Sequence, residues 1–108
     1  MRIAFATRDG HHLDEQFRAA PRLVIYEVTA AGFLRHGEAA VSAAPGRRSE
    51  AKAWALAGCD VLYAAAIGPS SVARLVARGI QVATAPLGAG IEDLVRAHQA
   101  ALAEGRAA

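Results

Sequence analysis

Cysteine is nearly absent from this sequence of 108 residues, which has only Cys59. A single thiol excludes an internal disulfide framework and a metal site built from several cysteines. Aromatic residues make up only 6%, and Lys52 is the only lysine, so the formal charge of +2 rests on arginines scattered along the chain. Nucleic-acid-binding surfaces usually gather basic residues among aromatics. We therefore expect no nucleic-acid partner.

Long hydrophobic runs are also missing. No apolar stretch approaches the ~20 residues that a membrane helix needs. Residues 1–6 hold one basic residue and then an apolar run too short for the core of a signal peptide. We therefore expect no membrane partner and a cytoplasmic location. The length suits one domain with one core, residues 1–108, in which 103–108 form a frayed tail. The oligomeric state stays unspecified.

The first half of the chain predicts an antiparallel meander of three strands. In residues 3–6, Ile3 and Phe5 alternate with two alanines, which leaves one face small enough to lie under a helix. Residues 22–29 are rich in β-branched and aromatic residues, as strands are. Residues 33–41 read as a return strand after a short turn, and Gly37 within them suggests a bulge or a sheet edge.

The second half predicts a strand–helix–strand unit between two further helices. Ser49 is a candidate N-cap for a helix over residues 50–57, which ends at Gly58. Residues 61–67 are continuously apolar, as in a strand buried on both faces. Pro69 suits the first turn of the next helix. The remaining elements are a strand at 80–84 and a helix over 91–102. Apolar stripes comprise Val72, Leu75 and Val76 in the first of these helices, and Ile91, Leu94, Val95, His98 and Leu102 in the last.

The expected fold is therefore a mixed α/β domain. Its five-stranded sheet combines the antiparallel meander with the βαβ unit, and about three helices cover it. A right-handed crossover is expected in the βαβ unit.

The polar loop after the first strand is the main candidate site. His11 and His12 lie in it with Asp9, Asp14 and Glu15, and imidazole and carboxylate are ordinary ligands for iron, zinc or copper. Adjacent histidines on an extended segment point to opposite sides, so at most one of them would normally serve a given site. A solvated loop of charged side chains is the alternative interpretation.

Two turns before helices are candidate anion sites. Gly68, Ser70 and Ser71 open a helix at the end of a buried strand, where free backbone N–H groups and hydroxyls can hold an anion. This turn has neither the glycines of a dinucleotide fingerprint nor the lysine of a P-loop, so helix capping alone also explains it. Residues 88–90 offer a second such turn, with a tight turn or hinge as the alternative.

The remaining reactive residues favour structural roles. Cys59 precedes a buried strand and is interpreted as a small apolar core residue. His98 lies on the apolar stripe of the last helix, where a packed histidine is expected, and the face that His36 takes is undetermined. No serine, histidine and acid form a nucleophile elbow, and the acids near strand ends are too few for two-metal hydrolysis. The sequence thus favours a protein that is not an enzyme.

Several separated blocks resemble the dinitrogenase iron–molybdenum cofactor biosynthesis family, of the NifX, NifY and NafY type that also occurs at the C-terminal end of NifB. The opening block is Ile-Ala-Phe-Ala-Thr-Arg-Asp-Gly at 3–10, followed by Leu-Asp-Glu-Gln-Phe at 13–17 and Leu-Val-Ile-Tyr-Glu-Val at 23–28. Later blocks are Ala-Gly-Cys-Asp-Val-Leu-Tyr at 57–63, Ala-Ile-Gly at 66–68, Gly-Ile-Gln-Val at 79–82 and Ile-Glu-Asp-Leu at 91–94. The resemblance covers nearly the whole chain.

The resemblance implies a ribonuclease H-like three-layer fold without nuclease activity. It also implies a carrier or insertion chaperone for the iron–molybdenum cofactor or its iron–sulfur precursor, with nitrogenase or cofactor-assembly proteins as partners. A preassembled cluster needs only one or two protein ligands plus positive charge. The residues expected to bind it are His11, His12, Arg8, Arg18, Asp14 and Gln16, with either histidine as the metal ligand and Arg22 as further positive charge.

The chain departs from the family pattern at one position of this loop that matters for ligation. Where the family typically reads Asp-x-His-Phe-Gly, this chain has Gln16 in place of the histidine and Arg18 in place of the glycine. Glutamine is a poor iron ligand, so His11 or His12 must take over, or the cofactor is bound differently or not at all. Two rival functions follow. One is a binding or regulatory module of the same fold that recognises a small anion or a protein; the other is a metal-dependent hydrolase.

Overall fold

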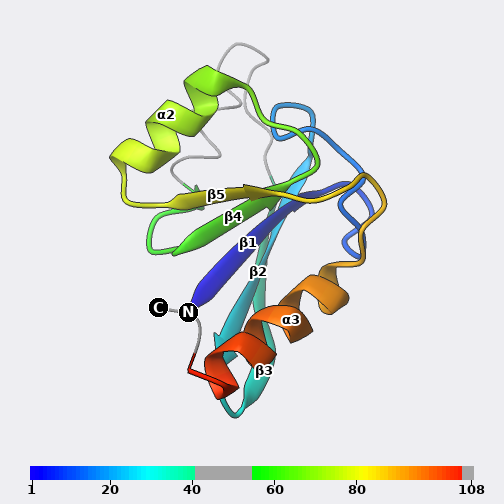
Figure 1. Cartoon of the computed structure of the whole chain (residues 1–108). Helices are drawn as coiled ribbons and strands as arrows, with labels where there is room; N and C mark the ends of the chain where they lie inside the picture. The colour runs from blue at the N-terminus through cyan, green and yellow to red at the C-terminus, as the bar shows by residue number, and fades with distance from the viewer. Residues whose placement is uncertain (41–54, 106–108) are drawn as a thin grey trace.

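The computed structural model describes residues 1–40 and 55–105. Within these residues the chain forms five strands and two helices, joined by loops (Figure 1). In chain order they are β1 (Arg2–Thr7), β2 (Arg22–Thr29), β3 (Gly32–Ala40), β4 (Val61–Ala64), α2 (Pro69–Ala77), β5 (Gln81–Thr84) and α3 (Ile91–Ala103). The predicted helix over 50–57 and its N-cap Ser49 lie almost entirely outside the described residues. Neither α2 nor α3 is long and apolar enough to span a bilayer.

The sheet has the order β3-β2-β1-β4-β5. Strands β1, β2 and β3 pair antiparallel, whereas β4 pairs parallel with β1 and with β5. The predicted meander and the predicted βαβ unit are therefore both confirmed, and they join along β1. Because β1, β4 and β5 run in the same direction, their C-terminal ends meet at one edge of the sheet.

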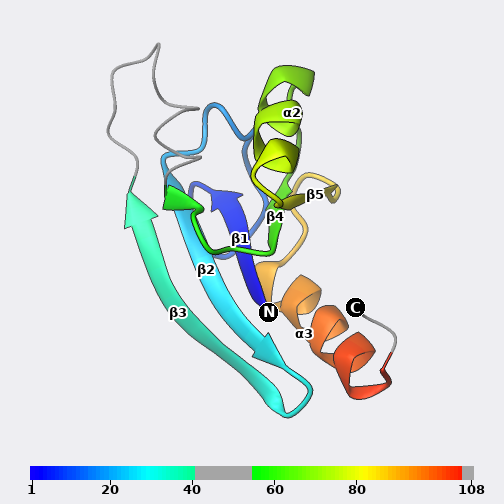
Figure 2. The same ribbon diagram turned by 90° about the vertical axis from the view of Figure 1, so that its left-hand side faces the viewer.

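Alternation along β1 assigns the core to two faces. Ala4 and Ala6 belong to a buried cluster with Leu75 of α2, and Ile3 and Phe5 belong to a second cluster with α3. Helices α2 and α3 accordingly lie on opposite faces of the sheet (Figures 1 and 2). Small side chains under one helix and large ones under the other explain why the central strand tolerates burial on both sides.

Strand β3 forms one edge of the sheet and carries a bulge. Its pairing with β2 shifts register between Ile25 and Tyr26, whose partners are Gly37 and Arg35, so that His36 is the extra residue. The prediction of a bulge or an edge at Gly37 is confirmed on both counts. His36 itself is exposed.

The predicted strand 61–67 is too long. Strand β4 ends at Ala64, and the next residues leave the ladder to contact the loop after β1. The backbone N–H of Phe17 donates to the Ala66 carbonyl at 2.8 Å. Apolar composition cannot distinguish a strand from an apolar segment that pairs elsewhere, and this is the reason for the error.

The predicted stripe on α2 is wrong at Val76, which is 57% exposed. The buried residues of α2 are Ser71 and Leu75, so the helix presents a face centred one residue earlier than expected. The closing helix was predicted correctly at its start, and its stripe of Ile91, Leu94, Val95, His98 and Leu102 faces the core of the α3 side. The ribonuclease H-like assignment stays a prediction.

Candidate functional site

The polar loop between β1 and β2 lies over the edge where the parallel strands end. Figure 1 shows it, in blue, between the start of α2 and the start of α3. On one side Leu13 exchanges hydrogen bonds with the segment before α3: its N–H donates to Ala89 O and its carbonyl accepts from Gly88 N, both at 2.8 Å. On the other side Phe17 bonds to Ala66. The loop is thus attached to both faces of the domain.

Two carboxylates shape the first turn of the loop. Asp14 accepts the backbone N–H groups of Arg8 at 2.7 Å and Asp9 at 3.1 Å. Asp9 Oδ1 accepts those of His11 at 2.7 Å and His12 at 2.9 Å, which is an Asx turn. Backbone N–H groups that have no partner in a ladder are therefore satisfied by side chains, which fix the shape of the turn.

Thr7 ties the turn to β1 from below. Its hydroxyl donates to the His12 carbonyl at 2.6 Å and accepts the N–H of Gly10 at 3.1 Å. Thr7 is fully buried, so this hydroxyl would be costly to bury without such partners. Gly10 has a φ of +84°, a conformation in which only glycine is unstrained.

Asp9 also orients the imidazole of His12. Nδ1 of His12 lies 2.8 Å from Asp9 Oδ2, which places the donated proton on Nδ1 and leaves Nε2 for another ligand. A carboxylate that holds the second nitrogen of a histidine is the usual arrangement behind metal-binding imidazoles. The His12 side chain is 53% exposed, so Nε2 is accessible from outside the domain.

The same contact changes both pKa values. The hydrogen bond to His12, with the N–H groups of His11 and His12, holds the pKa of the Asp9 carboxyl far below its usual range. Asp9 in turn raises the pKa of His12 above 6.5. Because the pKa of His12 is higher in the folded state than in the unfolded state, its ion pair with Asp9 stabilises the fold fully at pH values below the unfolded-state pKa. This contribution is lost as the pH rises through the folded-state pKa. When His12 is protonated on both nitrogens, a metal must displace the proton on Nε2 before it binds there.

Replacing Asp9 with asparagine should lower the pKa of His12 toward 6.5, because the charge and the strongest acceptor of its Nδ1 proton are both removed. NMR titration of the histidine ring protons measures this directly. His98 serves as the internal control, since burial and not Asp9 lowers its pKa, and its titration should not move. An unchanged His12 titration in Asp9→Asn would show that the pair is not formed in solution.

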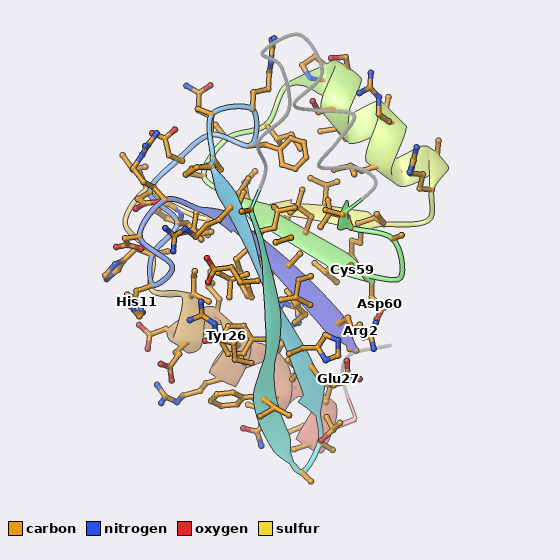
Figure 3. The ribbon with its side chains drawn as sticks, turned by 180° about the vertical axis from the view of Figure 1, so that it is seen from behind. Arg2, His11, Tyr26, Glu27, Cys59 and Asp60 are labelled. Carbon is orange, nitrogen blue, oxygen red and sulfur yellow. The ribbon has the colours of Figure 1, made fainter. Side chains whose placement is uncertain are left out.

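The second histidine of the loop, His11, has different surroundings. His11 is exposed and lines a small cavity of about 90 Å³ together with Gly10, Tyr26, Gly90, Ile91, Glu92 and Asp93. Figure 3 shows His11 at the outer edge of the molecule and Tyr26 on the sheet. His11 thus lines the cavity, whereas the ring of His12 is held by Asp9.

The predicted arginines and Gln16 lie on the outside of the loop. Arg8 forms an ion pair with Glu15 at 3.4 Å, and Arg18 is exposed. Gln16 is exposed as well, and its carbonyl accepts the N–H groups of Ala19 and Ala20. Of the predicted set, His12 and Asp14 take part with their side chains in the hydrogen-bonded turn built on Thr7 and Asp9, and Arg8 and His11 take part through their backbone N–H groups.

The predicted anion turn lies at the same edge of the sheet. Gly68 is the N-cap of α2, with no side-chain capping bond, and Pro69 is its first residue, as predicted. Ser70 is exposed, but Ser71 is buried against the core and is one of the two residues that α2 buries. Only one of the two hydroxyls is thus accessible to a ligand.

Sequence reasoning missed the role of Asp9 as the partner of His12 and the pairing of the loop with residues 88–91. The Asp-Gly-His-His pattern is the available signal for the first, because aspartate commonly accepts the N–H groups two and three residues later. The second has no local signal. Within residues 1–40 and 55–105, no three of histidine, cysteine, aspartate and glutamate come together as a metal site.

Comparison with known proteins identifies the family of this chain. The family model described as dinitrogenase iron-molybdenum cofactor matches residues 1–101. The chain belongs to this family. It is 35% identical over 89 residues to the protein NifX of Rhodobacter capsulatus and 32% identical over 99 residues to that of Klebsiella pneumoniae. A third relative, NifX of Azotobacter vinelandii, is 30% identical over 113 residues.

These three relatives are longer than this chain. The matches cover 74% of this chain and 56% of the Rhodobacter protein, and 89% of this chain and 64% of the Klebsiella protein. For the Azotobacter protein the shares are 100% and 71%. The chain thus spans little more than half to about seven-tenths of the length of these relatives.

Solved structures show the same fold at low sequence identity. The crystal structure of PH0822 is 18% identical, with a TM-score of 0.73, and the match covers 92% of this chain and 90% of that one. A dinitrogenase-named protein of Methanocaldococcus jannaschii is 11% identical, with a TM-score of 0.63 and coverage of 98% and 90%. The apo form of the orange protein of Desulfovibrio gigas is 24% identical, with a TM-score of 0.57 and coverage of 97% and 88%.

Proposed function

We propose that this chain is a non-enzymatic carrier in nitrogenase cofactor maturation. It binds the iron–molybdenum cofactor, or its iron–sulfur precursor, and passes it to nitrogenase or to a cofactor-assembly protein in the cytoplasm. Membership in the family named for this cofactor, and the likeness to three NifX proteins, support the proposal. The single observation that carries the site is His12, whose Nδ1 is fixed by Asp9 2.8 Å away.

The chemistry of the cargo suits a site with few ligands. In a preassembled cluster most coordination positions of iron are filled by sulfide, so a carrier supplies one or two further ligands. His12 Nε2 is such a ligand, and the Asp9 carboxylate fixes the ring and raises its basicity. A carrier must also release its cargo, and a single half-exposed imidazole at the rim of the domain permits this.

The proposal is tested by anaerobic titration of the purified protein with isolated cofactor and, separately, with its precursor. A coloured complex that keeps its iron through gel filtration is expected, at about one cluster for each chain. Iron that elutes only in the small-molecule fraction with both ligands would overturn the carrier function.

Restoring the family histidine should strengthen cluster binding. Gln16→His puts an imidazole where an amide, a poor iron ligand, now stands, on a backbone already fixed by the bridge to Ala66. We expect at least tenfold tighter binding in the same anaerobic titration. The matched control is Gln99→His, because Gln99 lies on α3, where its amide contacts Ala30 O. Equal affinities of the wild type and Gln16→His would show that this position does not face the cluster.

A further inference from the structure

Two arginines and one glutamate meet beside the candidate loop. Arg22 Nη1 lies 3.1 Å from Glu38 Oε1, and Arg35 Nη2 lies 2.9 Å from Glu38 Oε2. We refer to these three residues as the arginine cluster. A Cβ atom placed on Gly10 would be 3.7 Å from Arg22 Nη1 and 3.7 Å from Arg35 Nη2. Both guanidinium groups therefore reach the bare backbone of the loop at the same residue.

The bulge in β3 creates this cluster. Residues i and i+3 of a regular strand point to opposite faces of a sheet, so Arg35 and Glu38 would be separated. With His36 as the extra residue, Arg35 pairs with Tyr26 and Glu38 pairs with Val24. Tyr26 and Val24 both lie on the α3 face, and cross-strand partners share a face. Bulges commonly turn side chains toward functional sites in this way.

The cluster carries a surplus of positive charge. Two guanidinium groups share one carboxylate, which leaves a net charge of +1 on side chains that are 38–39% exposed. Each guanidinium has five N–H donors in a planar fork suited to carboxylate or phosphate oxygens. The contacts to Glu38 occupy only part of these donors.

The arginine cluster adjoins a small cavity at Gly10. Its lining includes Gly10, the residue that both guanidinium groups reach, and also the carboxylates Glu92 and Asp93 at the start of α3. These two carboxylates share Arg96, at 3.3 and 3.9 Å. An anion near Gly10 is therefore attracted by the guanidinium groups of Arg22 and Arg35 and repelled by the carboxylates at the start of α3.

We propose that the arginine cluster binds a small oxyanion, a carboxylate or a phosphate, at Gly10. This anion site is distinct from His12, the proposed ligand of the iron–sulfur cargo. Its occupancy is measured on protein without any iron–sulfur cargo. Failure of anion binding is therefore distinguishable from failure of the carrier function. The two chemical sources, organic acids and phosphate, are separated by the choice of probe.

Citrate and inorganic phosphate are titrated separately into ¹⁵N-labelled protein at constant ionic strength. Saturable shifts of the Gly10 amide and of the Arg22 and Arg35 Nε resonances are expected with at least one probe. Citrate alone would identify carboxylates, phosphate alone would identify phosphate groups, and both would identify a general oxyanion site. The variants Arg22→Gln and Arg35→Gln should each weaken binding at least tenfold.

Arg35→Lys keeps the charge but removes the fork, so it should bind more weakly than the wild type and more tightly than Arg35→Gln. It also serves if Arg35→Gln does not fold. Arg74→Gln, an exposed arginine on α2, is the matched control and should leave the affinity unchanged. The absence of saturable shifts with both probes, or equal weakening by Arg74→Gln, would overturn the proposal.

Discussion

His12→Ala should abolish the retention of the bound iron–sulfur cofactor or precursor. The substitution removes the imidazole of the candidate loop whose Nδ1 is already fixed, by Asp9 at 2.8 Å. Loss of a supporting partner alone typically costs 10–100-fold in metal affinity, so we expect loss of the ligand itself to cost ~100-fold or more. The affinity is measured by anaerobic titration, with iron in the protein fraction after gel filtration as the readout.

Two other histidines provide the controls for this experiment. His11→Ala changes the adjacent residue, which faces the small cavity, and His36→Ala changes an exposed residue of the β3 bulge. Both should retain the cluster to within a few-fold of the wild type. A cluster that stays bound to His12→Ala but is lost from His11→Ala would move the ligand to the other side of the loop.

Phe17→Ala should produce the largest loss of stability among changes in the candidate loop. Phe17 is 1% exposed and packs in the core cluster under α2, although it lies in the loop and not in a strand. Removing a buried phenylalanine costs about 3–5 kcal/mol, against a total stability of about 5–15 kcal/mol for a domain. Urea denaturation followed by circular dichroism measures the free energy of unfolding.

Val76→Ala is the control for this prediction. Val76 is apolar and lies on the same side of the sheet, but it is 57% exposed, so its truncation should change the free energy of unfolding by less than ~0.5 kcal/mol. A Phe17→Ala protein as stable as Val76→Ala would mean that the loop is not anchored in the core. The loop would then not hold Asp9 and His12 as described.

Strands whose two faces differ in composition could be predicted from the sequence. The alternation of Ile3 and Phe5 with alanines assigned both faces of β1, and the β-branched run gave β2 its bounds at Arg22 and Thr29. Gly37 indicated the irregular edge of the sheet. In each case the signal is local, because the residues that decide the structure are neighbours in the chain.

Details that depend on distant partners could not be predicted. Residues 65–67 are as apolar as β4, but they pair with the loop around Phe17 and leave the sheet. By helical spacing, Val76 and Ser71 can each lie on the same face of α2 as Leu75. Only the position of α2 on the sheet decides which of the two is buried. The pairing of Leu13 with residues 88–89 joins segments about 75 residues apart and leaves no local pattern.

The candidate site shows the same division. The loop and its two histidines were predicted, and the expectation that at most one of them serves a given site stays a prediction. The choice of His12 depends on Asp9, whose carboxylate accepts two backbone N–H groups and also holds the ring. The arginine cluster was only partly predictable, because the bulge at His36 reverses the face that Arg35 would otherwise take.

Pulsed EPR of the cluster-bound protein tests most directly whether His12 binds the cargo. In a paramagnetic state of the complex, protein labelled with ¹⁵N-histidine should show hyperfine coupling from a directly bound imidazole nitrogen. The coupling should persist in His11→Ala and disappear in His12→Ala, at protein concentrations high enough to keep a complex formed. A complex without coupling to a histidine nitrogen, or with coupling that survives in His12→Ala, would contradict the account.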